Sequence, residues 1–139
     1  MVFEEGVGDK GGVLIYHMFN EPALNTFDSK IANKRDGLNG AKIVGNSKIP
    51  VRRLDEILIS IPYIPPIDIL SVDVEGFDFQ VLNSNDWIRF RPKIVIVECS
   101  SNDLLSIDSD PVNKFLNSLG YVAYAKTGLS IIFKSNRNE

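Results

Sequence analysis

The sequence contains one cysteine, Cys99, and one histidine, His17. A single cysteine excludes an internal disulfide framework and a multi-cysteine metal site, and it suits a reducing cytosol. A lone histidine is far more often structural or solvent-facing than a ligand, so no histidine-based metal site or catalytic triad is predicted. No apolar run approaches the roughly 20 residues of a membrane span, and no signal-peptide pattern is seen. We therefore expect a cytoplasmic protein without a membrane partner.

The chain also carries little net charge. The 139 residues carry a net charge of -3, with 44% hydrophobic and 24% charged residues. This balance gives no general attraction to nucleic acid, so no nucleic-acid partner is expected. The length and composition fit one globular domain over residues 1–139. Within it, residues 19–48 show little apolar periodicity and are interpreted as a loop-rich excursion with a short helix around 27–34.

The stretch GVGDKGG, residues 6–12, has the spacing G-x-G-x-x-G of a dinucleotide-binding turn. That turn needs a strand before it and a helix after it, whose N-terminus faces the phosphates. Here the following residues are VLIYHMF, which are β-branched and aromatic. Residues 1–5 are a candidate for the preceding strand. The pattern therefore favours a turn between two strands over a nucleotide site.

Strand and helix patterns alternate along the rest of the chain. Apolar residues recur at helical spacing from Asp55, after Gly76 and after the pair Asp110-Pro111, where aspartate is a favoured N-cap. A strand is expected before each of these helices, at residues 50–53, 67–72 and 93–98. Two further strands, at 121–125 and 129–134, flank Lys126-Thr127-Gly128 as a hairpin. The runs at 67–72 and 93–98 are mostly apolar, as in strands covered by helices on both faces. This predicts an α/β fold with a mostly parallel sheet and a C-terminal antiparallel hairpin.

Ligands of open α/β sheets gather at the carboxyl ends of the strands. Asp73, Glu75 and Gly76 follow one expected strand, and Glu98, Cys99 and Ser100 end or follow the next. A carboxylate here can accept a proton, orient a cationic ligand or help to hold a metal ion. For Asp73 and Glu75, capping of the following helix is an equally good interpretation. For Glu98 and Cys99 a structural role is preferred, and no metal ligand is assigned.

The remaining polar and aromatic residues are interpreted structurally. Trp87 and Phe90, with Arg89 and Arg91, could form a substrate lip, but a buried aromatic anchor is favoured. Four cations are most simply solvated surface charges: Lys34, Arg35, Arg52 and Arg53.

The run IDILSVDVEGFDFQVLNSNDWIRFRPKIVIVE, residues 67–98, resembles the central signature of FkbM-type methyltransferases. That signature has a hydrophobic strand, Asp-x-Glu-Gly, a helix ending near a leucine, and Arg-Pro-Lys before another strand and a glutamate. Upstream, ALNTFDSKIANK and IPVRRLDEIL are similar to the family's Asn-Thr-Phe and Val-Pro-Val-x-x-Leu-Asp segments. Downstream, LNSLGYVAYAKTGLSIIFK is similar to its closing helix, strand and hairpin. The resemblance spans nearly the whole chain.

The resemblance implies a Rossmann-like class I methyltransferase fold that uses S-adenosylmethionine. It implies transfer of the sulfonium methyl group, commonly to a hydroxyl oxygen of a small-molecule or glycan acceptor. By position, Asp73 and Glu75 match the family's Asp-x-Glu-Gly and are the candidates for proton removal and positioning of the acceptor. The cofactor-binding candidates are Asp9, Asp73 and Gly76, with Asp9 near the adenine.

The family's glycine turn and its second strand do not match any segment, whereas VFEEGVGDKGGVLIY resembles its third strand and the excursion after it. The resemblance therefore implies a domain truncated at its N-terminus, corresponding to the C-terminal two thirds. Such a chain would expose an apolar sheet edge and face, so self-association is expected there.

Three hypotheses of function follow. The first is an S-adenosylmethionine-dependent methyltransferase, active when complete. The second is a non-catalytic remnant or interaction module of the same fold. The third is an acidic-motif phosphohydrolase, which ranks last because the second carboxylate is Glu75 and the expected serine or threonine is missing.

Overall fold

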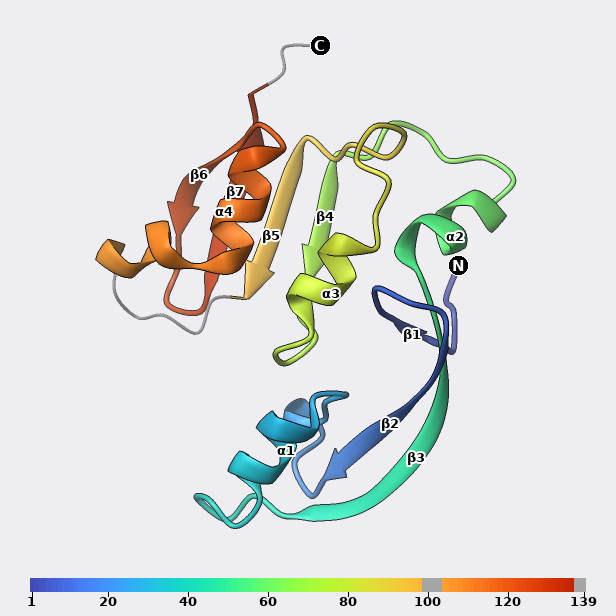
Figure 1. The fold of residues 1–139 in the computed structure, drawn as a ribbon, viewed down its shortest axis with the longest axis vertical. Coiled ribbons are helices and arrows are strands. Elements are labelled where there is room, and N and C mark those ends of the chain that lie inside the picture. Colours follow the sequence, from blue (N-terminus) through green and yellow to red (C-terminus); the bar gives the residue numbers. More distant parts are fainter. Residues whose placement is uncertain (99–103, 137–139) are drawn as a thin grey trace.

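A computed structural model describes residues 1–98 and 104–136. Its N-terminal half holds a three-stranded sheet in the order β1-β3-β2 (Figure 1). The sheet consists of β1 (Gly6–Val7), β2 (Gly12–Phe19) and β3 (Ile43–Arg52). Strand β3 pairs parallel with β1 and antiparallel with β2. The helices of this half are η1 (Pro22–Leu24) and α1 (Ser29–Arg35), with α2 (Leu54–Ser60) directly after β3.

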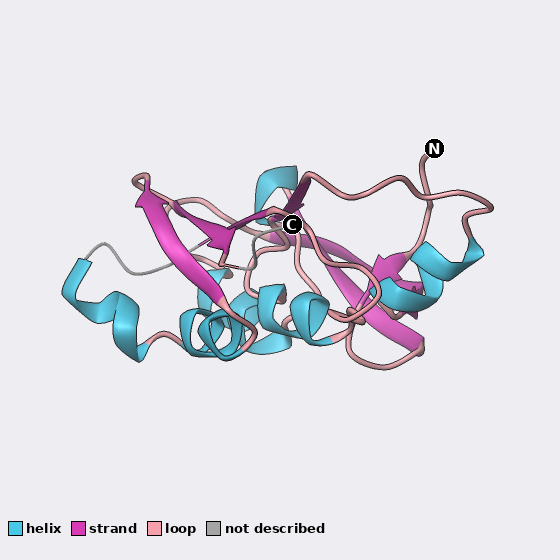
Figure 2. Ribbon diagram, turned by 90° about the horizontal axis from the view of Figure 1, so that it is seen from above, coloured by secondary structure: helices cyan, strands magenta, loops and turns pink. Residues whose placement is uncertain are grey.

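The C-terminal half holds a four-stranded sheet in the order β4-β5-β7-β6. The strands are β4 (Ile69–Val72), β5 (Ile94–Glu98), β6 (Tyr121–Lys126) and β7 (Ser130–Ser135). Its helices are α3 (Asp78–Asn83), η2 (Leu104–Ser109) and α4 (Pro111–Ser118). Figures 1 and 2 show α3 and α4 on the same side of the strands. These two helices therefore lie on one face of the sheet, whereas helices on both faces were expected.

The prediction of one mostly parallel, Rossmann-like sheet is wrong. The strands form two mixed sheets, and in the larger sheet only β4 and β5 pair in parallel, while β5–β7 and β7–β6 are antiparallel. The strand-helix-strand pattern was identified correctly, but β7 returns from the hairpin and inserts between β5 and β6. The pattern along the chain does not reveal this insertion, because the hairpin fixes only the contact between β6 and β7.

The larger core lies between the four-stranded sheet and helices α3 and α4. Alternate residues of β5 and β7, including Val95 and Phe133, are fully buried there. Trp87 joins this core, because its indole N–H donates to Leu82 O at 2.9 Å and its rings meet Phe115 and Tyr121 edge-on. Trp87 is therefore a buried anchor rather than part of a substrate lip, as the sequence favoured.

The glycine-rich stretch forms a turn between strands. Gly8 N–H donates to Arg52 O at 3.1 Å, and β2 begins at Gly12, so no helix opens at this point. Strand β3 begins at Ile43 and so includes the last residues of the segment expected to be loop-rich. His17 has a structural role, with Nδ1 2.7 Å from Asn46 Oδ1 and Nε2 3.0 Å from Ser29 Oγ.

Strand β4 lies at one edge of its sheet, and its partner in the described part of the chain is β5. Ile69 on this strand is 57% exposed. Self-association through this edge stays a prediction. None of the helices within residues 1–98 and 104–136 has the length and apolar character needed to cross a bilayer.

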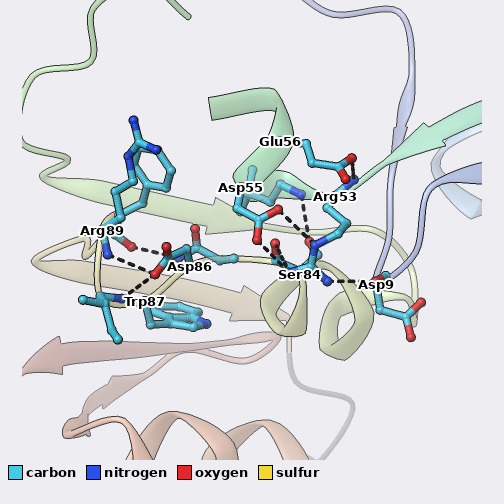
Figure 3. A network of polar contacts seen from close by, with 12 residues as sticks. Asp9, Arg53, Asp55, Glu56, Ser84, Asp86, Trp87 and Arg89 are labelled. Carbon is cyan, nitrogen blue, oxygen red and sulfur yellow. Dashed lines mark hydrogen bonds and ion pairs between the residues drawn. The ribbon is translucent and has the colours of Figure 1, made fainter. Parts of the chain in front are cut away.

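Arg53 connects the two halves of the molecule, as Figure 3 shows. Its guanidinium donates to Asp9 O at 2.9 Å and to Ser84 O at 3.1 Å, and it makes two hydrogen bonds to the Asp55 carboxylate. Ser84 also accepts from two N–H groups at the start of α2, those of Leu54 and Asp55. Arg53 was interpreted as a solvated surface charge; instead, it fixes the turn after β1 against α2 and α3.

The Arg53–Asp55 pair gives a pH-dependent prediction. The Arg53 hydrogen bonds lower the pKa of Asp55 below its ordinary value of 3.8. The unfolded chain therefore binds more protons just below pH 4, so this part of the stability is present at neutral pH and is lost as pH falls through the lowered pKa. Because both side chains are partly exposed, Asp55→Asn should cost about 1 kcal/mol at neutral pH. The deficit should shrink at strongly acidic pH.

Urea unfolding at a series of pH values measures this difference. Asp108→Asn is the matched control, since Asp108 is exposed on η2 and should leave stability unchanged at every pH. A deficit for Asp55→Asn that is the same across the pH range would contradict the assignment.

Candidate functional site

The candidate site is the turn that follows β4, from Asp73 to Gly76. Glu75 has φ 52° and Gly76 has φ 93°, so two successive residues adopt left-handed backbone conformations. A Cβ on Gly76 would lie 2.0 Å from Cδ1 of Ile31 in helix α1. Glycine is required here both for the dihedral angle and for the close approach of the helix.

The segment around α1 holds this turn in place. The Thr26 hydroxyl, on a residue only 1% exposed, donates to Glu75 O at 2.9 Å and accepts from Asp28 N–H at 2.9 Å. Arg35 Nη2 lies 2.5 Å from Glu75 Oε2 in an ion pair. Arg35 therefore contacts the candidate site directly, whereas a solvated surface charge was expected.

The carboxylates of Asp73, Glu75 and Glu98 lie together, with one oxygen of each within 4.8 Å of the others. They meet because β4 and β5 run parallel with Val72 beside Val97, so the carboxyl ends of both strands reach the same edge of the sheet. An antiparallel pair would place these ends at opposite edges. The position of these carboxylates therefore depends on the parallel pair β4–β5 alone. The antiparallel strands β7 and β6 lie on the other side of β5 and do not separate β4 from β5.

Glu98 belongs to this acidic group, although a purely structural role was preferred for it. It is the last residue of β5, so its position at the strand end was the signal that could have identified it. Cys99 and Ser100, the other residues expected here, lie outside the described residues.

Neither Asp73 nor Glu75 caps α3. The N-cap of α3 is Phe77, and the structure shows no side-chain capping bond there. Asp78 Oδ2 accepts from Gly76 N–H at 3.1 Å, in the turn before the helix. The Glu75 carboxylate is directed to Arg35 instead. The Asp73 side chain is exposed and has no hydrogen bond or ion pair within the described part of the chain.

Burial and like charge act on the acidic group. Burial raises the pKa of Glu98, and the charges of Glu75, Asp73 and Asp78 raise it further, while Arg35 lowers it. Burial likewise raises the pKa of Asp78, opposed by backbone N–H donors and increased by the charge of Asp73. The carboxyl groups of Glu98 and Asp78 therefore hold protons more readily than isolated ones, because their anions lose water and are repelled by nearby negative charges.

A cleft of about 630 Å³ lies between β4 and the three-stranded sheet. Asp73 and Glu75 lie on its wall, and aromatic and apolar side chains cover much of the rest, namely Val7, Tyr16, Phe27, Leu54, Leu70, Val72 and Val81. A concave site of this size with a few polar groups on an apolar wall is typical of small-molecule binding. Asp9 is not among the lining residues; its backbone carbonyl is bound by Arg53.

A model of the FkbM methyltransferase domain matches residues 6–123 of the 139. The chain belongs to the FkbM methyltransferase domain family. The resemblance seen in the acidic motif and its flanking segments is thereby confirmed. A comparison with curated proteins and one with solved structures each gave no match. The matched residues 6–123 include Asp73 and Glu75, which lie on the cleft wall, and Thr26, whose hydroxyl holds the turn.

The close approach at Gly76 gives a prediction about stability. Gly76→Ala combines an unfavourable left-handed dihedral angle, about 1–2 kcal/mol, with overlap against Ile31, about 1–3 kcal/mol more. The control is Gly37→Ala, because Gly37 has φ 84° but a Cβ added there would meet no atom within 4 Å. Thermal or urea unfolding should therefore show a larger loss for Gly76→Ala than for Gly37→Ala.

Adding Ile31→Val removes the Cδ1 atom that causes the overlap. The double variant Gly76→Ala/Ile31→Val should recover part of the stability lost by Gly76→Ala. Equal losses at Gly76 and Gly37, with no recovery in the double variant, would show that α1 does not pack tightly on this turn.

Proposed function

We propose that this chain takes part in S-adenosylmethionine-dependent methyl transfer to a hydroxyl oxygen of a small-molecule or glycan acceptor. The single observation that carries the proposal is the match to the FkbM domain, whose Asp-x-Glu-Gly motif falls on the acidic turn beside the cleft. When bound, the cofactor supplies an electrophilic methyl group on a sulfonium. The chain's own residues would position the acceptor and accept the proton of its hydroxyl group.

The cleft fits the chemistry of this cofactor. Aromatic side chains such as Tyr16 and Phe27 offer flat apolar surface for an adenine ring, and carboxylates suit ribose hydroxyls or a positive sulfonium. Asp73 and Gly76 are the proposed cofactor contacts, with Asp73 contributing its unpaired carboxylate and Gly76 the shape of the turn. Asp9 stays the proposed contact to the adenine, although it does not line the cleft in this structure.

Asp73 and Glu75 have different surroundings, which suggests how the proposed work is divided. Glu75 is bonded to Arg35, and such a pair holds a carboxylate in a fixed orientation. Asp73 is exposed, lines the cleft and has no partner in the described residues. We assign Asp73 to contact with substrate or cofactor and Glu75 to positioning.

Isothermal titration calorimetry with S-adenosylmethionine tests the proposal on this chain. Wild-type protein should bind, and Asp73→Asn should weaken binding by about 10- to 100-fold, the usual loss when a charged hydrogen-bond partner is removed. Asp108→Asn, a change of the same kind on η2, should bind like wild type. Absence of binding by the folded wild-type chain would contradict the proposal and favour a non-catalytic interaction module.

A further inference from the structure

The two faces of the four-stranded sheet differ in what covers them. Helices α3 and α4 pack on one face, where Val95, Val97, Ile131 and Phe133 are buried. Because side chains alternate along a strand, the neighbours of these residues point to the opposite face, which we call the open face. The apolar residues of the open face on β4, β5, β6 and β7 are Ile69, Ile94, Ile96, Val122 and Ile132.

Several apolar side chains of the open face are exposed to solvent. Ile69 is 57% exposed at one edge of the sheet, and Val122 is 40% exposed at the other. Tyr124 is 73% exposed and lies on the same face as Lys134, whose Nζ is 5.9 Å from the centroid of the tyrosine ring. A surface on which apolar side chains gather between polar ones is typical of a contact with another protein.

The register of the strands makes this apolar surface continuous. Ile94 on β5 lies between Ile69 on β4 and Lys134 on β7. Two residues farther along β5, Ile96 lies beside Ile132. Ile94, Ile96 and Ile132 are each partly exposed, so the centre of the open face is apolar and accessible.

The open face carries opposite charges toward its two ends. Lys134 lies in the row of Ile94, and Glu98 ends β5 beside Ser130. Four residues of β5 separate these two rows, which is about 13 Å along the strand. Neither Lys134 nor Glu98 has an ion pair within residues 1–98 and 104–136. Each charge therefore lacks an opposite partner on its own copy of the chain.

We propose that two copies of this chain pack open face to open face, with their strands antiparallel and a two-fold axis between them. The row of Ile96 and Ile132 lies midway between the row of Lys134 and the row of Glu98. An axis over this central row brings Lys134 of each copy to Glu98 of the other, so the same ion pair forms twice.

The charges select both the orientation and the occupant. A two-fold axis parallel to the strands would place lysine against lysine and glutamate against glutamate, and such like-charge contacts are unfavourable. The antiparallel arrangement matches every charge with its opposite, because the pattern on this face is complementary to itself. Facing sheets lie about 10 Å apart, a distance that the central isoleucines fill and a lysine side chain can span.

This inference does not depend on methyl transfer, and its test uses no cofactor. Sedimentation velocity of the chain over a concentration series should show a monomer that converts to a dimer. Lys134→Glu should raise the dissociation constant about tenfold or more, since it creates two like-charge contacts in each dimer. Lys134 is exposed, so this variant should fold, which circular dichroism checks. The matched control is Lys114→Glu on the exposed side of α4, which should associate like wild type.

A charge exchange tests the pairing itself. Glu98→Lys should weaken association as Lys134→Glu does, and the double variant Lys134→Glu/Glu98→Lys should recover the dimer because each ion pair is restored with its charges reversed. The proposal is overturned if wild type stays monomeric at every concentration reached, or if Lys134→Glu associates as tightly as Lys114→Glu. Association that survives Lys134→Glu would point to pairing through the β4 edge instead. If Glu98→Lys does not fold, the comparison of Lys134→Glu with Lys114→Glu still decides.

Discussion

The structure depends on the contact between helix α1 and the turn after β4. Ile31 occupies the space that a side chain at position 76 would need, Thr26 binds the backbone oxygen of Glu75, and Arg35 binds its carboxylate. These contacts join the three-stranded sheet to the four-stranded sheet at the place where the acidic residues lie. The cleft exists because both sheets are held at this point, with Arg53 providing a second connection farther along the chain.

The sequence predicted most of the strands but not how they assemble. The apolar runs of β4 and β5 and the hairpin of β6 and β7 were recognised because each is a local pattern. The pairing of β7 with β5 joins segments far apart in the sequence, and no local pattern predicts it. Likewise, Ile43 to Lys48 contain Gly45, Asn46 and Ser47, which disfavour strand, yet pairing with β2 makes them part of β3.

The same limit applies to the site. The motif Asp-x-Glu-Gly and its family resemblance located Asp73 and Glu75, but Thr26 and Arg35 lie 49 and 40 residues from Glu75 and show no local sign of contact with it. Asp28, directly before the short helix, is the N-cap of α1. This favoured capping residue could have indicated that Arg35 lies on an ordered helix.

Two separate interactions hold Glu75 at the turn, whereas Asp73 has none of this kind in the described residues. The backbone oxygen of Glu75 is bound by Thr26 and its carboxylate by Arg35, so both the backbone and the side chain of Glu75 are fixed at the turn. Asp73 makes neither kind of contact in the described residues and lies on the cleft wall. The fold therefore orients the carboxylate of Glu75 and leaves that of Asp73 without a partner in the described residues, so Asp73 is the carboxylate that the proposed ligand would contact.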